Sequence, residues 1–170
     1  FSRGELIELL GLPEDQVSVI AGGVDERFTP AADARRAREH FRLDTPYVLC
    51  VASHTARKNL QALVPLTEHV EVVVAGGHRP QFAREQGLEA LRLLGHVDDA
   101  LLPGLYAGAA AFALPSLYEG SGLPVLEAMA CGTPVVAADT TALPETSAGA
   151  AVLAEPHGEA FAAALTALLR

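Results

Sequence analysis

Short, mainly apolar runs recur along most of the chain, and they restrict its fold more than any other feature. They cover residues 47–52, 70–75, 90–95, 109–114, 134–138 and 149–153. A strand is almost continuously apolar when both faces of its sheet are covered, as in parallel sheets. Segments with helical spacing separate the runs. This alternation predicts an α/β fold, a doubly wound parallel sheet of the Rossmann-like type.

The spacing of apolar residues also places the helices and the boundaries. Helices are expected over residues 1–12, 31–41, 57–67, 98–108, 124–131, 142–147 and 159–169. A further short strand is expected at 16–20, and residues 80–87 are expected to form a loop or a short helix. We interpret residues 1–30 as an interdomain junction segment and residues 31–170 as one domain.

Ligands of doubly wound sheets bind outside the carboxyl ends of the strands. The loops that follow the expected strands are therefore the candidates for a site. These loops are residues 53–58, 76–80, 95–98, 115–123 and 138–141.

Composition excludes several classes of function. The 170 residues carry a net charge of −9, so no nucleic-acid partner is expected, because phosphate backbones need clustered cations. No apolar run reaches the ~20 residues of a membrane helix. The two cysteines form no disulfide framework, and no metal-ligand spacing is present, so neither a metal nor a cofactor is expected. With no secretory signal visible, a cytoplasmic location is expected. The sequence starts at Phe1 and stops within a helical pattern, so we expect a piece of a longer protein.

The stretch from residue 115 to residue 134 carries the main functional signal, P-S-L-Y-E-G-S-G-L-P-V-L-E-A-M-A-C-G-T-P. Pro124 suits the start of a helix and Gly132 its end. A strand, a glycine loop and a helix start together form a site for anions and polar ligands. Glu119 and Glu127 flank this site, and carboxylates accept hydrogen bonds from hydroxyl groups. A nucleotide sugar fits this combination better than a bare phosphate does.

Two cations elsewhere in the sequence supply the positive charge that this stretch lacks. Lys58 is the only lysine of the sequence, and it stands beside Arg57 after the first strand of the sheet. Two exposed cations are the simpler interpretation. However, cations at the start of the helix expected there would oppose its dipole, and an anion between them would remove that misfit.

The other candidates are weaker. His54 and His96 lie in candidate loops, where a structural role suits each, and Asp98 with Asp99 reads as a helix cap. Gly120 and Gly122 could be turn residues, or they could let the backbone approach a ligand. No Walker phosphate loop, no G-x-G-x-x-G after the first strand of the sheet and no G-x-S-x-G occurs, which disfavours ATP and NAD sites and α/β hydrolases.

The segment E-G-S-G-L-P-V-L-E-A-M-A-C-G-T-P-V-V-A resembles the signature of retaining glycosyltransferases of family 4, the group-1 glycosyltransferases. Further similar segments are F-S-R-G-E-L, A-G-G-V-D, Y-V-L-C-V-A-S-H-T-A-R-K-N-L, L-G-H-V-D-D and L-Y-A-G-A, so the resemblance covers nearly the whole chain. It implies a GT-B architecture of two Rossmann-like domains. This chain would be the C-terminal, donor-binding half with the junction, and the N-terminal acceptor domain would be absent.

The resemblance also implies roles for single residues. Arg57 and Lys58 would hold and stabilise the donor diphosphate, and Glu119 would contact hydroxyls of the transferred sugar. Glu127 would take the ribose hydroxyls, and the backbone of Val97 would contact the base. The remaining donor contacts would come from the loop and the helix start, at Gly120, Ser121, Gly122, Leu123 and Pro124. We give Arg57, Lys58 and Glu119 the catalytic roles and assign no residue as the general base of the reaction.

The implied reaction moves a hexose from a nucleoside-diphosphate sugar to an acceptor with retention and without a required metal. The acceptor, a sugar or a glycolipid, and any peripheral membrane contact would belong to the absent domain. Ser121 departs from the aromatic residue usual in the family, Gly22 from Asn and Ala52 from Gly. The R-K-N and S-L-Y-E-G segments look most like the mannosyltransferase-type branch. A sugar-nucleotide epimerase, which would have only His54 and His96 for acid–base chemistry, and a non-catalytic nucleotide-binding module remain alternatives.

Overall fold

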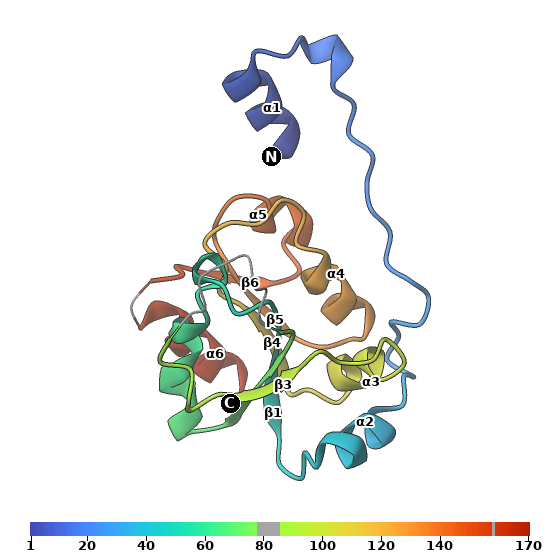
Figure 1. Ribbon diagram of the computed structural model, residues 1–170, viewed down its shortest axis with the longest axis vertical. Coiled ribbons are helices and arrows are strands. Elements are labelled where there is room, and N and C mark those ends of the chain that lie inside the picture. Colours follow the sequence, from blue (N-terminus) through green and yellow to red (C-terminus); the bar gives the residue numbers. More distant parts are fainter. Residues whose placement is uncertain (78–85, 158) are drawn as a thin grey trace.

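Six parallel strands form one sheet in the computed structural model, which describes residues 1–77, 86–157 and 159–170 (Figure 1). The strands are β1 Tyr47–Val51, β2 Glu71–Ala75, β3 Arg92–Gly95, β4 Ala111–Leu114, β5 Val135–Ala138 and β6 Val152–Ala154. They lie in the order β3-β2-β1-β4-β5-β6, and each neighbouring pair is parallel. The order reverses between β1 and β4, which is where doubly wound sheets bind ligands.

Helices cover both faces of this sheet. On one face lie α2 Ala34–Phe41, α3 Leu102–Ala107, α4 Leu123–Ala130 and α5 Leu143–Ser147. On the other lie α6 Ala160–Leu168 and a 3-10 helix, η3, Leu60–Glu68. The predicted doubly wound α/β fold is therefore confirmed.

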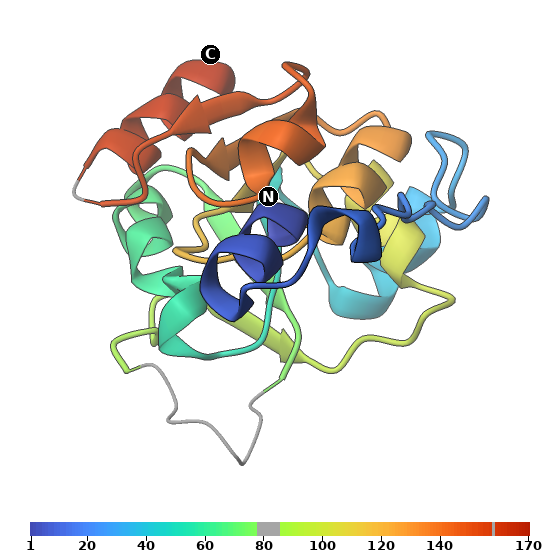
Figure 2. The same ribbon diagram turned by 90° about the horizontal axis from the view of Figure 1, so that it is seen from above.

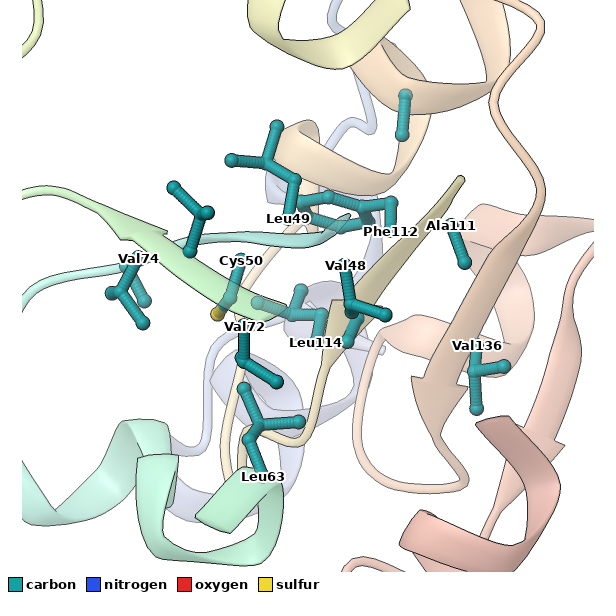
Figure 3. Close-up of a cluster of buried hydrophobic side chains, with 14 of the residues drawn as sticks. Val48, Leu49, Cys50, Leu63, Val72, Val74, Ala111, Phe112, Leu114 and Val136 are labelled. Atoms are coloured by element: carbon teal, nitrogen blue, oxygen red, sulfur yellow. The ribbon is translucent and has the colours of Figure 1, made fainter. Parts of the chain in front are cut away.

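The core explains why the strand sequences are almost wholly apolar. Val48 and Leu49 of β1 point to opposite faces of the sheet, yet both are fully buried. Figure 3 shows them among Val72, Phe112 and other buried side chains. At about 25 cal/mol per Å² of apolar surface, such two-sided burial is the main stabilising contribution to the fold.

The α-helix predicted over residues 57–67 is wrong. The segment forms two 3-10 helices, η2 Ala56–Lys58 and η3, separated by Asn59 in a left-handed conformation with φ 53°. Asn tolerates this conformation better than most side chains do, and it interrupts the helical backbone. Pro65 lies inside η3 and supplies no N–H for an α-helical bond.

The strand predicted at residues 16–20 is also wrong. A second short 3-10 helix, η1, spans Glu14–Gln16, and the extended residues after it pair with no strand of the described chain. Val19 is 71% exposed and Ile20 is 92% exposed. A strand requires a neighbouring strand for its N–H and C=O groups, and within the described residues this segment has no such neighbour.

The first thirty residues lie outside the sheet (Figure 1). Helix α1 Ser2–Leu10 lies beside α5, and the chain then runs along the molecule to α2 (Figures 1 and 2). Phe1 precedes α1 and makes no side-chain cap, and the hydroxyl of Ser2 donates to the carbonyl of Gly120 at 3.0 Å. The expectation for residues 80–87 falls largely on 78–85, which lie outside the described residues.

Candidate functional site

The loops that follow β1 and β4 are joined at the point where the strand order reverses. The N–H of Leu117 donates to the carbonyl of Arg57 at 2.8 Å, and the Arg57 guanidinium donates to the carbonyl of Tyr118 at 3.1 Å. The Asn59 side chain donates to the carbonyl of Pro115 at 3.1 Å. These bonds hold the cationic turn against the loop that carries Glu119.

Lys58 and Glu119 form a buried ion pair within this junction of loops. The Lys58 ammonium bonds the Glu119 carboxylate, and each side chain is only 10% exposed. Arg57 lies 3.7 Å from the other carboxylate oxygen and keeps a side chain that is 53% exposed. The interpretation of two exposed cations therefore does not hold for Lys58. Glu119 neutralises the buried ammonium of Lys58, so the cation that this cluster presents to solvent is the Arg57 guanidinium.

Side chains of the loop after β5 fix the backbone of the loop that carries Glu119. The N–H of Glu119 donates to the hydroxyl of Thr141 at 3.0 Å, and the hydroxyl of Thr140 donates to the carbonyl of Ser116 at 3.0 Å. Thr141 has φ 50°, which is an unfavourable conformation for a β-branched residue. Such strain costs on the order of 1–3 kcal/mol and is found mainly at functional sites.

Arg57 and Lys58 end the η2 turn and do not begin an α-helix. The misfit with a helix dipole, from which we inferred an anion between the two cations, therefore does not arise. The support for an anion site now comes from the position of the cations at the strand-order reversal and from the burial of Lys58.

The glycine loop leads into α4 as the sequence predicted. Gly122 precedes the helix with φ 69°, and a Cβ atom there would lie 2.7 Å from a methyl group of Leu143. Pro124 is the second helical residue. At the other end Gly132 is left-handed with φ 72°, and the N–H of Thr133 donates to the carbonyl of Ala128 at 2.9 Å. This bond pattern is a Schellman ending, and the predicted helix end is confirmed.

Glu127 lies in α4 and receives a hydrogen bond from a buried tyrosine. The Tyr106 hydroxyl donates to Oε2 of Glu127 at 2.7 Å. Burial raises the pKa of Glu127 above its ordinary value, the Tyr106 bond opposes this rise, and the charge of Asp99 adds to it. The sequence did not indicate Tyr106, because nothing in the pattern of α3 shows that this residue reaches a helix that starts after the next strand.

Two cavities border Glu127 and the glycine loop before α4. One of about 280 Å³ lies between Glu127, Leu123 and Asp99 on one side and junction residues such as Phe28 on the other. The other, of about 570 Å³, lies between α1 with the junction segment and the loop at Gly120 and Ser121. Leu123 borders both cavities. Of the predicted residues, Gly120, Ser121, Leu123 and Glu127 therefore border accessible space.

Two predicted residues lie apart from the ion pair. Val97 follows β3, the outermost strand, and its side chain is buried. Ser121 is exposed, and its carbonyl accepts a bond from the Thr146 hydroxyl at 2.6 Å, which assigns no role to its side chain. The histidines are in different surroundings, because His54 is buried and His96 is exposed.

Residues 1–77, 86–157 and 159–170 contain no group of three or more metal-ligating side chains placed to hold a metal ion. Over the same residues, no helix is both long enough and apolar enough to cross a membrane.

Doubly wound sheets bind their ligands at the switch point, and this Rossmann-like sheet carries cations and carboxylates there. Residues 45–170 match the family described as "Glycosyl transferases group 1", and the chain belongs to that family. It is 33% identical over 175 residues to the O-antigen chain mannosyltransferase B of Escherichia coli, an alignment that covers 92% of this chain and 46% of that protein.

Solved structures with a similar fold are described as a sucrose-phosphate synthase and a glycosyltransferase. The sucrose-phosphate synthase of Thermosynechococcus elongatus superposes with a TM-score of 0.77 and 28% identity, over 99% of this chain and 47% of that one. WaaG, a glycosyltransferase involved in lipopolysaccharide biosynthesis, superposes with a TM-score of 0.78 at 15% identity, over 98% and 52% of the two chains. The fold is therefore the Rossmann-like fold of GT-B glycosyltransferases. The chain spans about half the length of these proteins.

Proposed function

We propose that the chain is the C-terminal, donor-binding half of a retaining glycosyltransferase of family 4, which transfers a hexose from a nucleoside-diphosphate sugar to an acceptor. The observation that carries the proposal is the cluster of Arg57, Lys58 and Glu119 at the strand-order reversal. The family match supports the transferase class and does not favour an epimerase. The mannosyltransferase relative makes mannose the first sugar to test.

The charges suggest how the donor is held. Arg57 and Lys58 bind the diphosphate, so Lys58 exchanges part of its interaction with Glu119 for the ligand. Glu119 then has acceptor oxygens for hydroxyls of the transferred sugar, and Glu127 accepts from the ribose. The loop from Gly120 to Pro124 meets the sugar and phosphate, and the backbone of Val97 meets the base. The family resemblance and the positions of these residues in the fold support these roles.

In the proposed reaction the bond between the anomeric carbon and the diphosphate oxygen breaks, and a bond to the acceptor oxygen forms on the same face of the sugar. The acceptor proton leaves with the departing diphosphate. Arg57 and Lys58 stabilise the negative charge that develops on this leaving group, a task that fixed cations perform without reorganisation. On this proposal no metal ion is required.

The acceptor site is proposed to belong to a second domain, because the chain corresponds to about half of its relatives. Exposed apolar side chains of the junction segment, among them Leu9 and Ile20, support a surface that this domain covers. A sugar or glycolipid acceptor, any peripheral membrane contact and a cytoplasmic location are parts of the same proposal.

Binding measurements on this chain test the proposal. Calorimetry with UDP, GDP and ADP is expected to show weak binding of at least one of them, and no sugar transfer by the chain alone. Lys58→Ala and Arg57→Ala are each expected to weaken that binding about tenfold or more, since each removes a charge-assisted contact of about 1.5–3 kcal/mol.

Arg35→Ala is the matched control, because Arg35 is an exposed cation of α2 that pairs with Glu39 and is expected to leave affinity unchanged. Absence of binding to all three nucleotides would contradict the proposal, and so would normal affinity in both Arg57→Ala and Lys58→Ala. Arg57→Ala keeps the test valid if Lys58→Ala fails to fold, since Arg57 is half exposed. Nucleotide binding without transfer by the full-length protein would instead favour a non-catalytic module.

A further inference from the structure

We propose that Tyr106 is a positioning residue for nucleotide binding, which fixes one oxygen of the Glu127 carboxylate and so presents the other to the ligand. The proposal rests on the proposed role of Glu127 toward the ribose hydroxyls. It adds a residue outside the loops at the carboxyl ends of the strands, because Tyr106 lies within α3.

The Tyr106 hydroxyl has a fixed position. Its side chain is fully buried, and its ring packs against Phe112 of β4 and Phe28 of the junction, at centroid distances of 5.3 and 5.7 Å. Its own carbonyl accepts a bond from the Thr133 hydroxyl at 2.6 Å. A side chain held from both sides and through its backbone cannot turn away from Glu127, so the donor stays in one place.

Glu127 needs such a donor. A glutamate side chain has several rotatable bonds, and this one borders the 280 Å³ cavity. Among the described residues no other hydrogen bond or ion pair restrains its carboxylate. The Tyr106 bond engages Oε2, and Oε1 has no hydrogen-bond partner among the described residues. One restrained oxygen leaves the other as an acceptor with a defined direction, which suits the hydroxyls of a ribose.

Tyr106 is a donor at every working pH. Burial and the neighbouring charge of Glu127 hold the pKa of Tyr106 well above its ordinary value of 10, so the hydroxyl keeps its proton. Its bond lowers the pKa of Glu127 and thereby favours the carboxylate form that accepts from a diol. The other titratable groups around Glu127 are Asp99, Cys131, Asp25 and Arg27.

A purely structural role for Tyr106 is the competing interpretation, and Tyr47 provides its control. Tyr47 is also fully buried, and its hydroxyl donates to the carbonyl of Leu105 at 2.7 Å. Tyr47→Phe and Tyr106→Phe each remove one buried hydroxyl and one hydrogen bond. Only the second removes a bond to Glu127.

The experiment measures nucleotide affinity between pH 5 and pH 9 for the whole chain, with whichever of UDP, GDP and ADP binds best. Tyr106→Phe is expected to lower affinity about three- to tenfold at pH 8, the fold-change for loss of one hydrogen bond. Without the donor the pKa of Glu127 rises further, so its carboxylate is protonated earlier as the pH falls. The pH at which affinity is half lost is therefore expected to move upward, whereas Tyr47→Phe leaves both quantities unchanged.

A double-variant cycle gives the second measurement. In a Glu127→Ala background, Tyr106→Phe is expected to cause little further loss of affinity, because the acceptor that the Tyr106 hydroxyl orients is gone. An unchanged affinity and pH profile in Tyr106→Phe would overturn the proposal, as would an equal loss in both backgrounds.

The failure of the proposed function would look different. It would appear as absence of nucleotide binding by the unaltered chain at every pH, and the positioning role would fall with it. The carboxyl carbon of Glu127, followed by NMR titration without nucleotide, would still show an upward pKa shift in Tyr106→Phe. That result would leave Tyr106 as a structural partner of Glu127 only.

Discussion

At the scale of single residues, the Lys58–Glu119 pair is the most costly feature of the site. Taking two charges out of water carries a penalty of several kcal/mol per ion, which their attraction offsets only when the geometry is good. Both side chains are 10% exposed, so neither charge is well solvated. The pair keeps Lys58 neutralised within the protein and holds it at the place where a diphosphate is proposed to bind.

Loss of the Glu119 charge is therefore expected to lower the free energy of unfolding more than loss of the Lys58 charge does. Glu119→Gln leaves the buried Lys58 charge with no acidic partner among the described residues, and is expected to cost about 3–5 kcal/mol. Lys58→Met leaves Glu119 with Arg57 at 3.7 Å, and is expected to cost less, about 1–3 kcal/mol. Urea unfolding at pH 7 measures both free energies.

Glu39→Gln is the control for this comparison. It breaks the Arg35–Glu39 pair, whose side chains are 87% and 64% exposed, and is expected to change stability by less than about 0.5 kcal/mol. The double variant Lys58→Met/Glu119→Gln should be more stable than Glu119→Gln alone. Equal costs for the two single variants would show that Arg57 does not compensate Glu119.

The sequence allowed part of this site to be predicted. Lys58 and Glu119 follow strands that a doubly wound sheet brings together, so their proximity was expected from topology. Their direct contact was not, because it depends on the turn at Asn59 and on the bond from Asn59 to Pro115. Tyr106 was missed because a buried tyrosine in an apolar helix gives no sign of which polar group its hydroxyl will meet.

At the scale of elements, the start of α4 depends on one glycine. Gly122 adopts φ 69°, which disfavours any side chain, and lies close to Leu143 of α5. The same backbone position allows α4 to begin directly after the loop that carries Glu119. The backbone conformation of Gly122 therefore determines both the path of the loop and the packing of α4 on α5.

Gly122→Ala is expected to destabilise the fold by about 1–3 kcal/mol, because the new methyl group would be only 2.7 Å from the Leu143 Cδ2 atom and the φ angle is strained. Gly120→Ala is the matched control two residues earlier, where a Cβ atom meets nothing within 4 Å. It is expected to change stability by less than about 0.5 kcal/mol. Thermal unfolding measures both, and similar losses in the two variants would contradict this account of the loop.

The segment after β1 shows where pattern reasoning fails for an element. Its apolar residues have helical spacing, and the buried residues Leu60, Leu63 and Leu66 recur every three positions. That spacing fits a 3-10 helix, with three residues per turn, as well as one face of an α-helix. Asn59 and Pro65 favour the 3-10 helix. The left-handed backbone of Asn59 interrupts an α-helix, and Pro65 has no N–H to donate within one.

At the scale of the whole molecule, the chain has a sheet domain and a junction segment that contacts it sparsely. The apolar strands indicated the sheet domain well, because a strand that is covered on both faces is apolar at almost every position. The junction was predicted poorly. Residues 16–20 have the composition of a strand, but composition cannot tell whether a pairing neighbour exists, and the described chain provides none.

The contacts of α1 and of Phe1 before it are peripheral and mainly polar, and the Phe1 ring also lies edge-on to Tyr118 at a centroid distance of 5.8 Å. The N-terminal ammonium group contacts Glu145 at 2.6 Å, and Tyr118 donates to Glu5 at 2.5 Å. None of the α1 residues is buried. Exposed ion pairs contribute about 0–1 kcal/mol each, so the segment adds little to the stability of the sheet.

Deletion of residues 1–22 is therefore expected to lower the melting temperature by no more than about 3 °C, whereas Phe28→Ala in the whole chain is expected to cost more. Phe28 is the junction residue whose ring packs on Tyr106, and its truncation opens a gap against a fully buried side chain. Differential scanning calorimetry compares the two variants. A larger loss on deletion than on Phe28→Ala would show that α1 is an integral part of the sheet domain. It would also show that the junction is held at both its ends and not only where Phe28 packs on Tyr106.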